Sequence, residues 1–320
     1  MTLEPEFGRE SSLTNAANVG SLTAIVKRIT PVGICSMCVL AIGMGGLAVA
    51  DDDDDKDRNR RILVKCDKGK SIQRKLDRAK PGDIIEVRGT CNESIVMVTD
   101  RVSLDCKSVA DGSIVGTGDA LSTIRVMARN VTVANCDVSA GDSTSNTVGI
   151  GRGASMTLRS NKVSGSPGRN IIVVAQNSYG RLIDNEIAGA RNGVFISSGS
   201  MADLFLNDIS DVTNGVLVTN SAAVDLVDNI ITGLDATPPF GAGVFVSRTA
   251  TANFSNDANF GSGDNVIQNF AHGVRCRDNS AVRFGSFSIG AVPQDDGTGN
   301  DMNTDFEFEC AADTSGGAAF

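Results

Sequence analysis

The sequence predicts an all-β fold in which short strands from a repeated unit stack into parallel sheets. The first observation is a repeat of about 22 residues, in which a Gly or Asn opens one apolar strand and an Asn opens the next. The second is the alternation of apolar residues inside each strand, as at Val194 and Ile196 or at Val216 and Val218, which is typical of a pleated strand. A unit of this size cannot bury its apolar face alone, so successive units must stack.

Two markers define the repeat. The first marker recurs at steps of 21, 23, 22, 28 and 30 residues: Gly149, Asn170, Gly193, Gly215, Gly243 and Gly273. The second marker recurs at steps of 24, 22 and 22 residues, and a Leu lies three residues before each of its members: Asn161, Asn185, Asn207 and Asn229. Repetition at this period predicts roughly nine stacked coils.

The recurrent Asn residues at the second marker predict a structural ladder. Asn tolerates the left-handed backbone conformation that a sharp bend between sheets requires. If every coil places its Asn at the same bend, the side-chain amides can hydrogen-bond from coil to coil. The alternative is that Asn161, Asn185, Asn207 and Asn229 line a binding groove.

The segment from Cys66 to Cys106 reads as the entrance to such a stack. It contains a predicted amphipathic helix from Ser71 to Ala79 and a Pro-Gly-Asp turn at 81–83. With this segment and the Asn-marked repeat, the chain resembles the right-handed parallel β-helix proteins of the pectin-lyase-like superfamily over about residues 62–290. The resemblance implies a single-stranded right-handed parallel β-helix with an N-terminal capping helix. The superfamily includes polysaccharide lyases, glycoside hydrolases, epimerases and non-catalytic surface proteins.

Both ends of the chain differ from the repeat. Residues 1–50 read as a signal peptide region, because Lys27 and Arg28 precede the apolar run 31–50, which ends in Ala48-Val49-Ala50. An uncleaved membrane anchor is the alternative. Residues 51–61 form an acidic linker, and residues 291–320 form an irregular C-terminal cap or tail. The mature protein is therefore expected to be secreted, in an extracellular, periplasmic or cell-surface location, with no membrane span.

An exported chain with an even number of cysteines favours disulfides. Six cysteines follow the apolar run: Cys66, Cys91, Cys106, Cys136, Cys276 and Cys310. Several connectivities remain open. Within the β-helix that the resemblance implies, Cys66–Cys91 would hold the N-terminal cap, Cys106–Cys136 would link adjacent coils, and Cys276–Cys310 would tether the tail.

The composition excludes several classes of function. A net charge of −9 gives no basic surplus and disfavours nucleic acid as a partner. One His excludes a zinc site built on several His residues, and the absence of Trp with a single Tyr excludes a Trp-lined sugar platform. Saccharide contact must then depend on hydrogen bonds and charges, which favours a non-catalytic or weakly binding role.

The resemblance allows the catalytic classes to be tested against this chain. Lyases of the superfamily hold Ca²⁺ with several acidic side chains that project from one sheet. In this chain Asp203 and Asp225 occupy the same position in adjacent repeats. They could form a weak cation site or be two solvated outward residues, and the second interpretation is favoured. Polygalacturonase-like hydrolases need acids before a His. Here His272 precedes Asp295-Asp296 and Asp305, so the order is wrong, and His272 is interpreted as a surface turn residue.

Arginines offer the remaining candidates for substrate binding. Arg169 and Arg191 lie one or two residues before first-marker positions, which predicts adjacent coils, and Arg152 is expected near the same face one coil earlier. Stacked guanidinium groups can bind carboxylates or sulfates. The alternative is that all three are soluble turn residues. No catalytic residue, resident metal or cofactor is predicted, and Ca²⁺ enters only under a lyase hypothesis.

These observations predict a secreted or surface-exposed β-helix, without recognised catalytic residues, that acts in cell-surface structure or in contact with polysaccharide or a cell-surface glycan. The alternative is an enzyme, a pectate-lyase-like lyase or an epimerase rather than a hydrolase, acting on an acidic polysaccharide. An enzyme would show converging ionisable side chains on one sheet, whereas a structural module would show uniform small polar positions.

Overall fold

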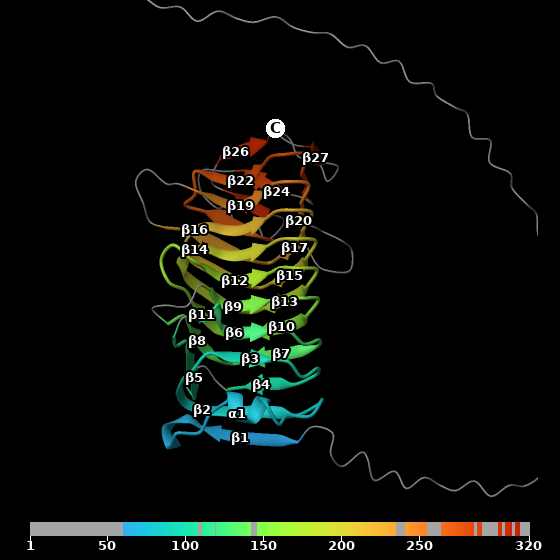
Figure 1. The fold of residues 1–320 in the computed structure, drawn as a ribbon. Coiled ribbons are helices and arrows are strands. Elements are labelled where there is room, and N and C mark those ends of the chain that lie inside the picture. The colour runs from blue at the N-terminus through green and yellow to red at the C-terminus, as the bar shows by residue number, and fades with distance from the viewer. Residues whose placement is uncertain are drawn as a thin grey trace, which may run out of the picture. The chain divides into compact units, whose positions relative to one another are not determined.

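A computed structural model describes residues 60–107, 111–118, 120–141, 146–234, 241–254, 264–284, 287–289, 300–302, 305–308 and 311–313. The chain divides into two units, Met1–Asp51 and Asp52–Phe320. The first unit, with the predicted signal peptide region, lies outside the described residues, as do residues 52–59. In the second unit the strands form one stack from β1 to β27 (Figure 1).

All strand pairs in the stack are parallel, and they form three ladders. Ladder 1 contains β1 (Arg61–Lys65), β2 (Ile84–Asn92), β4 (Ser103–Asp105), β7 (Val131–Ala134), β10 (Ser155–Arg159), β13 (Tyr179–Ile183), β15 (Met201–Phe205), β17 (Ala223–Val227), β20 (Thr251–Phe254), β23 (Ala281–Phe284) and β27 (Ala311–Asp313). Ladder 2 contains the second half of β2, β5 (Gly112–Val115), β8 (Asp137–Ser139), β11 (Lys162–Ser164), the first halves of β14 (Glu186–Ile196) and β16 (Asp208–Val218), β18 (Ile230–Gly233), β21 (Val266–Gln268), β25 (Asn300–Met302) and β24 (Phe287–Ile289). Ladder 3 contains β3 (Ile95–Met97), β6 (Ser122–Val126), β9 (Asn146–Ile150), β12 (Asn170–Val174), the second halves of β14 and β16, β19 (Ala242–Val246), β22 (His272–Cys276) and β26 (Asp305–Phe308).

About seven regular coils, from β4 to β22, contribute a strand segment to each ladder. This is slightly fewer than the nine predicted, because the layers below and above them are less regular. The strands β25, β26 and β27 still pair in parallel with β21, β22 and β23. Strand pairing therefore continues past residue 290, where the sequence predicted the repeat to end.

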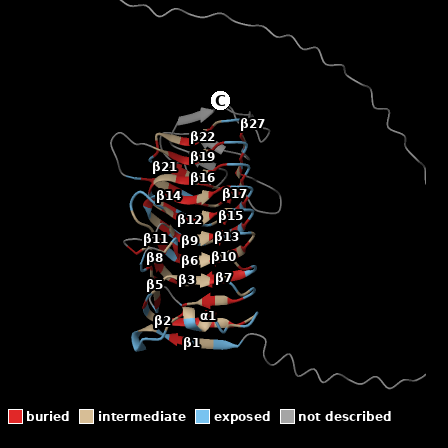
Figure 2. Cartoon of the chain, viewed as in Figure 1, coloured by how far each residue is buried: buried red, intermediate tan, exposed pale blue. Residues whose placement is uncertain are grey.

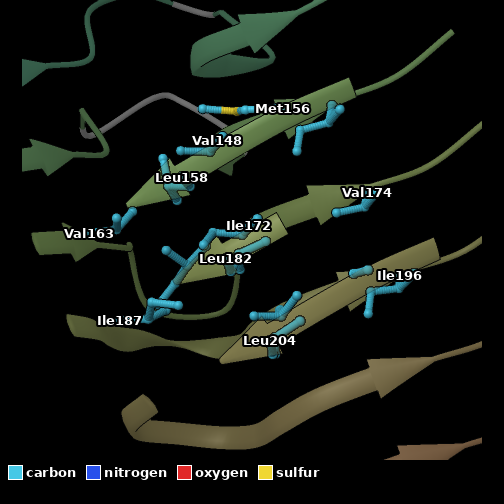
Figure 3. Packing of buried hydrophobic residues seen from close by; sticks show 14 of the residues in the cluster. Val148, Met156, Leu158, Val163, Ile172, Val174, Leu182, Ile187, Ile196 and Leu204 are labelled. Carbon is cyan, nitrogen blue, oxygen red and sulfur yellow. The ribbon is translucent and has the colours of Figure 1, made fainter. Parts of the chain in front are cut away.

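The core consists of aliphatic columns that run along the stack. Inward positions of ladder 1 place Leu158, Leu182, Leu204 and Leu226 in register on successive coils, and all are at most 1% exposed. Figure 3 shows such side chains stacked from coil to coil, and Figure 2 shows the alternation of buried and less buried residues along the strands. Full burial of one such side chain contributes about 2 kcal/mol, so the columns account for much of the stability.

The Asn residues at the second marker form a buried ladder between ladders 1 and 2. Each amide nitrogen donates to the amide oxygen one coil further on, at 3.0, 2.8, 3.0 and 2.9 Å along the series Asn161, Asn185, Asn207, Asn229 and Asn265. We call this series the inner Asn ladder. The amides of its later members also donate to the carbonyls of the repeated Leu residues.

The reason given for Asn at this bend was wrong in one respect. The left-handed residue is the one before each Asn: Ser160, Asp184, Leu206 and Asp228 have φ between 52° and 57°. The Asn residues are required for their amides, which satisfy backbone groups at the bend that would otherwise be buried without partners.

A second Asn ladder lies at the bend between ladders 2 and 3, and the sequence reasoning missed it. Asn170 pairs in register with Asn146 and Asn192, and their amides, with that of Asn214, hydrogen-bond at 3.3, 2.7 and 2.8 Å. The repeat had been aligned with Gly149 at the position of Asn170, whereas Gly149 pairs with Val173.

Glycine at the later first-marker positions has a steric cause. A Cβ on Gly193 would lie 2.7 Å from the carbonyl oxygen of Gly215, and a Cβ on Gly215 would lie 2.5 Å from that of Gly243. The same Cβ on Gly215 would collide with Cγ2 of Ile231. The chain of one coil therefore approaches the next too closely for any side chain.

A short helix covers the entrance of the stack. Helix α1 (Gln73–Leu76) is shorter than the predicted Ser71–Ala79, and it follows the 3-10 turn η2 (Cys66–Lys68). Ile72 is fully buried, and the Glu93 carboxylate accepts hydrogen bonds from the Ile72 and Gln73 amides. The Gln73 side-chain amide binds both backbone groups of Val96 in β3, which protects the strand edge from pairing with another chain.

Two disulfides connect the first coils. Cys66 is bonded to Cys91, and Cys106 is bonded to Cys136. Cys276 is also disulfide-bonded, and its predicted partner Cys310 lies outside the described residues. Among the residues that the structure describes, no helix is long and apolar enough to cross a membrane.

Candidate functional site

The structure brings together two of the three candidate arginines. Arg169 precedes β12 and Arg191 lies in β14, and the Arg191 amide donates to the Arg169 carbonyl at 3.0 Å, so the two residues occupy adjacent coils at the bend between ladders 2 and 3. Arg152 lies in the turn between ladders 3 and 1, with a φ of 60°. The prediction that Arg152 shares their face was wrong, because it rested on the misaligned marker Gly149.

A hollow of about 450 Å³ lies beside Arg191. Polar side chains line it only at Arg191, Asp211 and Thr213. The other lining residues are small or apolar: Pro167, Gly168, Gly189, Ala190 and Leu234. Arg169 does not line it. The hollow thus contains one guanidinium group and one carboxylate, which is too little polar chemistry to orient a hydroxyl-rich ligand.

The outward face of ladder 1 gathers a richer set of side chains on three consecutive strands. Tyr179 and Arg181 project from β13, Asp203 and Phe205 from β15, and Asp225 from β17. Arg181 pairs in register with Asp203, and Asp203 with Asp225, so these side chains project from neighbouring rungs about 4.8 Å apart. We call these five residues the Tyr179 surface.

Hydrogen bonding and stacking hold the Tyr179 surface together. The Tyr179 hydroxyl donates to Oδ2 of Asp203. The Arg181 guanidinium carbon lies 5.5 Å from the centre of the Phe205 ring, which is a cation–π contact. Tyr179 is 36% exposed and Arg181 is also exposed, so both remain accessible to a ligand.

Burial and the neighbouring carboxylates keep the Tyr179 phenol protonated. Burial raises the pKa of Tyr179 most, the hydrogen bond and charge of Asp203 and the charge of Asp225 raise it further, and Arg181 opposes them. The pKa of Tyr179 therefore lies well above its ordinary value, and the group acts as a neutral hydrogen-bond donor and acceptor. Two aromatic rings, a guanidinium group and two carboxylates on one face suit a ligand rich in hydroxyl groups.

An acidic region lies at the bend between ladders 1 and 2. It borders a hollow of about 380 Å³, where Lys162 lies 3.7 Å from Glu186. Burial and the charge of Glu186 raise the pKa of Asp208. Within the described parts of the chain, no group of three or more His, Cys, Asp or Glu side chains is placed to hold a metal ion.

Sequence reasoning recognised only part of the Tyr179 surface. The shared phase of Asp203 and Asp225 is observed as register pairing, and both are at outward positions. Tyr179, Arg181 and Phe205 were missed, although alternation within the strands places them at outward positions too. His272, interpreted as a turn residue, lies in β22 and pairs in register with Ala242.

Comparison with known proteins supports the fold. The family model described as "Right handed beta helix region" matches residues 117–260. Among solved structures, the deglycosylated pectin methylesterase from Aspergillus niger is 13% identical with a TM-score of 0.50, over 80% of this chain and 92% of that chain. Pectate lyase Pel9A is 12% identical with a TM-score of 0.51, over 82% of each chain. No curated protein matches the chain. The chain is therefore a right-handed parallel β-helix protein with the fold of the pectin-lyase-like superfamily.

Proposed function

We propose that this protein is an exported β-helix that binds a glycan on the Tyr179 surface without cleaving it. The observation that carries the proposal is the placement of the chain's one tyrosine, hydrogen-bonded to Asp203, beside Arg181 and Phe205 on one outward face. Sugar rings present C–H faces that pack on aromatic rings and hydroxyls that pair with carboxylates and guanidinium groups.

Two features of the groups present support binding without catalysis. A lyase needs a base that removes the proton from the substrate carbon next to the carboxylate group of the sugar. Tyr179 is held protonated, and the Arg181 guanidinium does not lose its proton in proteins. A hydrolase needs two carboxyl groups that flank the scissile bond. Asp203 and Asp225 project in the same direction from adjacent rungs and so approach a ligand from one side.

Export is supported by the apolar run before Asp51 and by the disulfides Cys66–Cys91 and Cys106–Cys136, since structural disulfides persist in oxidising compartments. N-terminal sequencing of the protein recovered from the native cell's exterior tests this part. A new terminus at Asp51 supports export with cleavage, and retention of the whole chain in the cytoplasm contradicts it.

Tyrosine fluorescence provides a direct test of the binding surface. Because the chain has no Trp and one Tyr, its intrinsic emission comes from Tyr179. Neutral and acidic oligosaccharides, including pectate and alginate fragments, are titrated while this emission is followed, with and without Ca²⁺. A saturable change with one glycan class, lost in Arg181→Gln and retained in the control Arg152→Gln, supports the proposal.

Two results contradict the proposal. If no glycan changes the Tyr179 emission, the Tyr179 surface is not a glycan-binding site. Shortened polymer, or a product absorbing in the ultraviolet as an unsaturated uronate does, makes the protein an enzyme and restores the lyase alternative. An epimerase is tested separately by nuclear magnetic resonance of the recovered polymer.

A further inference from the structure

The first coils carry a positive surface that the proposed function does not use. Arg61 and Lys65 project from the outward face of β1, Arg88 from β2 next to Lys65, and Lys107 follows β4. The Glu86 side chain lies among these groups and is only 11% exposed. We call Arg61, Lys65, Arg88 and Lys107 the basic surface.

One carboxylate organises most of the basic surface. Oε1 of Glu86 lies 2.9 Å from Nη2 of Arg88 and 3.1 Å from Nζ of Lys107, and Oε2 lies 4.0 Å from Nη1 of Arg61. Three cations thus share this anion, and Asp105 adds a second carboxylate on the next rung, in register with Glu86. With Lys65, the four basic side chains still exceed these two carboxylates by two charges. The three basic side chains remain between 45% and 59% exposed, so their outer faces are accessible.

The counter-ion stays charged over a wide pH range. Burial raises the pKa of Glu86, but hydrogen bonds and charges from Lys107 and Arg88 outweigh this effect, and the pKa is lowered overall. The arrangement of the basic side chains therefore does not depend on neutral pH. Lys65 adds a further cation, and no carboxylate within the described residues forms an ion pair with it.

Charge is also distributed unevenly along the chain. Residues 60–107 contain twelve Lys or Arg and seven Asp or Glu, the acidic linker before them (51–59) contains two Lys or Arg and six Asp, and residues 108–320 contain twelve Lys or Arg and twenty-two Asp or Glu. The first described coils are therefore net positive within a chain whose net charge is −9. Such a local field attracts anions even when the whole protein is negative.

We propose that the basic surface binds an anionic polysaccharide through its sulfate or carboxylate groups. Arg61 and Arg88 offer planar forks of N–H donors that match both groups, and Lys107 offers a mobile point charge. Both disulfides link these same coils, which favours an oxidising compartment and therefore a polysaccharide over a nucleic acid. The basic surface also contains no aromatic ring on which a base could stack.

This proposal is independent of glycan binding at the Tyr179 surface. The two surfaces lie on the same face of ladder 1, but β7 and β10 separate β4, beside Lys107, from β13, a distance of about 14 Å at the usual rung spacing. Loss of one binding activity in a variant can therefore be distinguished from loss of the other.

The test measures binding of fluorescein-labelled dextran sulfate to the full chain at several salt concentrations, with uncharged dextran and free sulfate as probes of the polymer and the ion. The variant Glu86→Gln/Arg88→Gln/Lys107→Gln removes two of the four basic groups together with their shared counter-ion, so no buried carboxylate is left unpaired. We expect its affinity to fall about tenfold and its salt dependence to become weaker, since fewer counter-ions are released.

The matched control makes the same change in net charge elsewhere. Asp211→Asn/Arg152→Gln/Arg248→Gln alters three exposed residues away from the first coils and is expected to bind like the parent. Lys65→Gln, which disturbs no ion pair among the described residues, is expected to weaken binding about twofold and decides the question if the triple variant does not fold.

Three outcomes overturn the proposal. Equal losses in the triple variant and its control would assign binding to net charge alone. Tighter binding of a DNA duplex than of dextran sulfate, at equal charge per length, would identify a nucleic-acid surface instead. Binding of free sulfate as tight as that of the polymer, or no binding of dextran sulfate, would show that no polysaccharide surface exists.

Discussion

Asn207 lies in the middle of the inner Asn ladder, and its replacement by Ala tests how much one rung contributes to stability. Its amide nitrogen donates to the carbonyls of Leu182 and Phe205 and to Oδ1 of Asn229, at 3.0, 3.1 and 3.0 Å. Its amide oxygen accepts from the backbone and side-chain nitrogens of Asn185, at 3.2 and 2.8 Å. The residue is 1% exposed, so water cannot reach these groups without opening the bend.

The expected cost of Asn207→Ala follows from these contacts. Each buried polar group left without a partner costs about 1–3 kcal/mol, although a water molecule in the space vacated can satisfy some of them. We therefore expect the free energy of unfolding to fall by about 4 kcal/mol. Urea-induced unfolding followed by circular dichroism measures this change.

Asn192→Ala is the matched control for Asn207→Ala. Asn192 belongs to the second Asn ladder, where its amide exchanges one hydrogen bond with Asn170 at 2.7 Å and one with Asn214 at 2.8 Å. These hydrogen bonds are only partly buried, so we expect Asn192→Ala to lower the free energy of unfolding by about 1 kcal/mol. Equal losses at Asn207 and Asn192, or a loss at Asn207 below about 1 kcal/mol, would refute the assignment of stability to buried amide bonds.

Three further predictions concern packing and protonation. Gly215→Ala is expected to destabilise the fold by about 3 kcal/mol in thermal unfolding because its Cβ meets backbone, whereas Gly151→Ala, whose Cβ meets only the Gln176 side chain, should be nearly neutral. Asp208→Asn is expected to raise Tm at pH 7 and leave it unchanged near pH 3. The pKa of Asp208 is raised in the folded state, so its ionisation lowers the free energy of unfolding as the pH rises above the ordinary Asp pKa. An equal change in Tm at both pH values would contradict this. Ultraviolet titration should show Tyr179 ionising well above the ordinary tyrosine range and Asp203→Asn lowering that midpoint, and an ordinary midpoint in the parent chain would contradict the hydrogen bond.

The inward features of the fold were predictable because they repeat. Asn161, Asn185 and Asn207 recur at nearly constant spacing since each satisfies the same backbone groups at the same bend. The second Asn ladder was missed because the coil around Asn170 carries Ile171 where later coils carry glycine, which shifted the alignment by several residues. The residue with the left-handed backbone was also predicted at the wrong position. It is the residue before each Asn of the inner Asn ladder, where Ser, Asp and Leu all occur, so the residue type does not indicate a positive φ.

The outward features could not be predicted from a repeat, because outward positions of a β-helix are not constrained by its neighbours in the core. One column of ladder 1 reads Thr157, Arg181, Asp203, Asp225 and Asn253 in register, changing charge almost from rung to rung. A repeat search averages over such a column and so discards the chemistry that it contains.

The variation among the outward residues of ladder 1 is evidence about function. A module whose only role is structural needs solubility from its outward face, and small polar residues on every rung would supply it. Here Tyr179 is hydrogen-bonded to Asp203 and Arg181 stacks on Phe205, contacts that solubility does not require. Near the entrance, three basic side chains share the carboxylate of Glu86. Ordering long charged side chains costs conformational entropy, so two such clusters on one face are better explained by ligands that they recognise than by solvation.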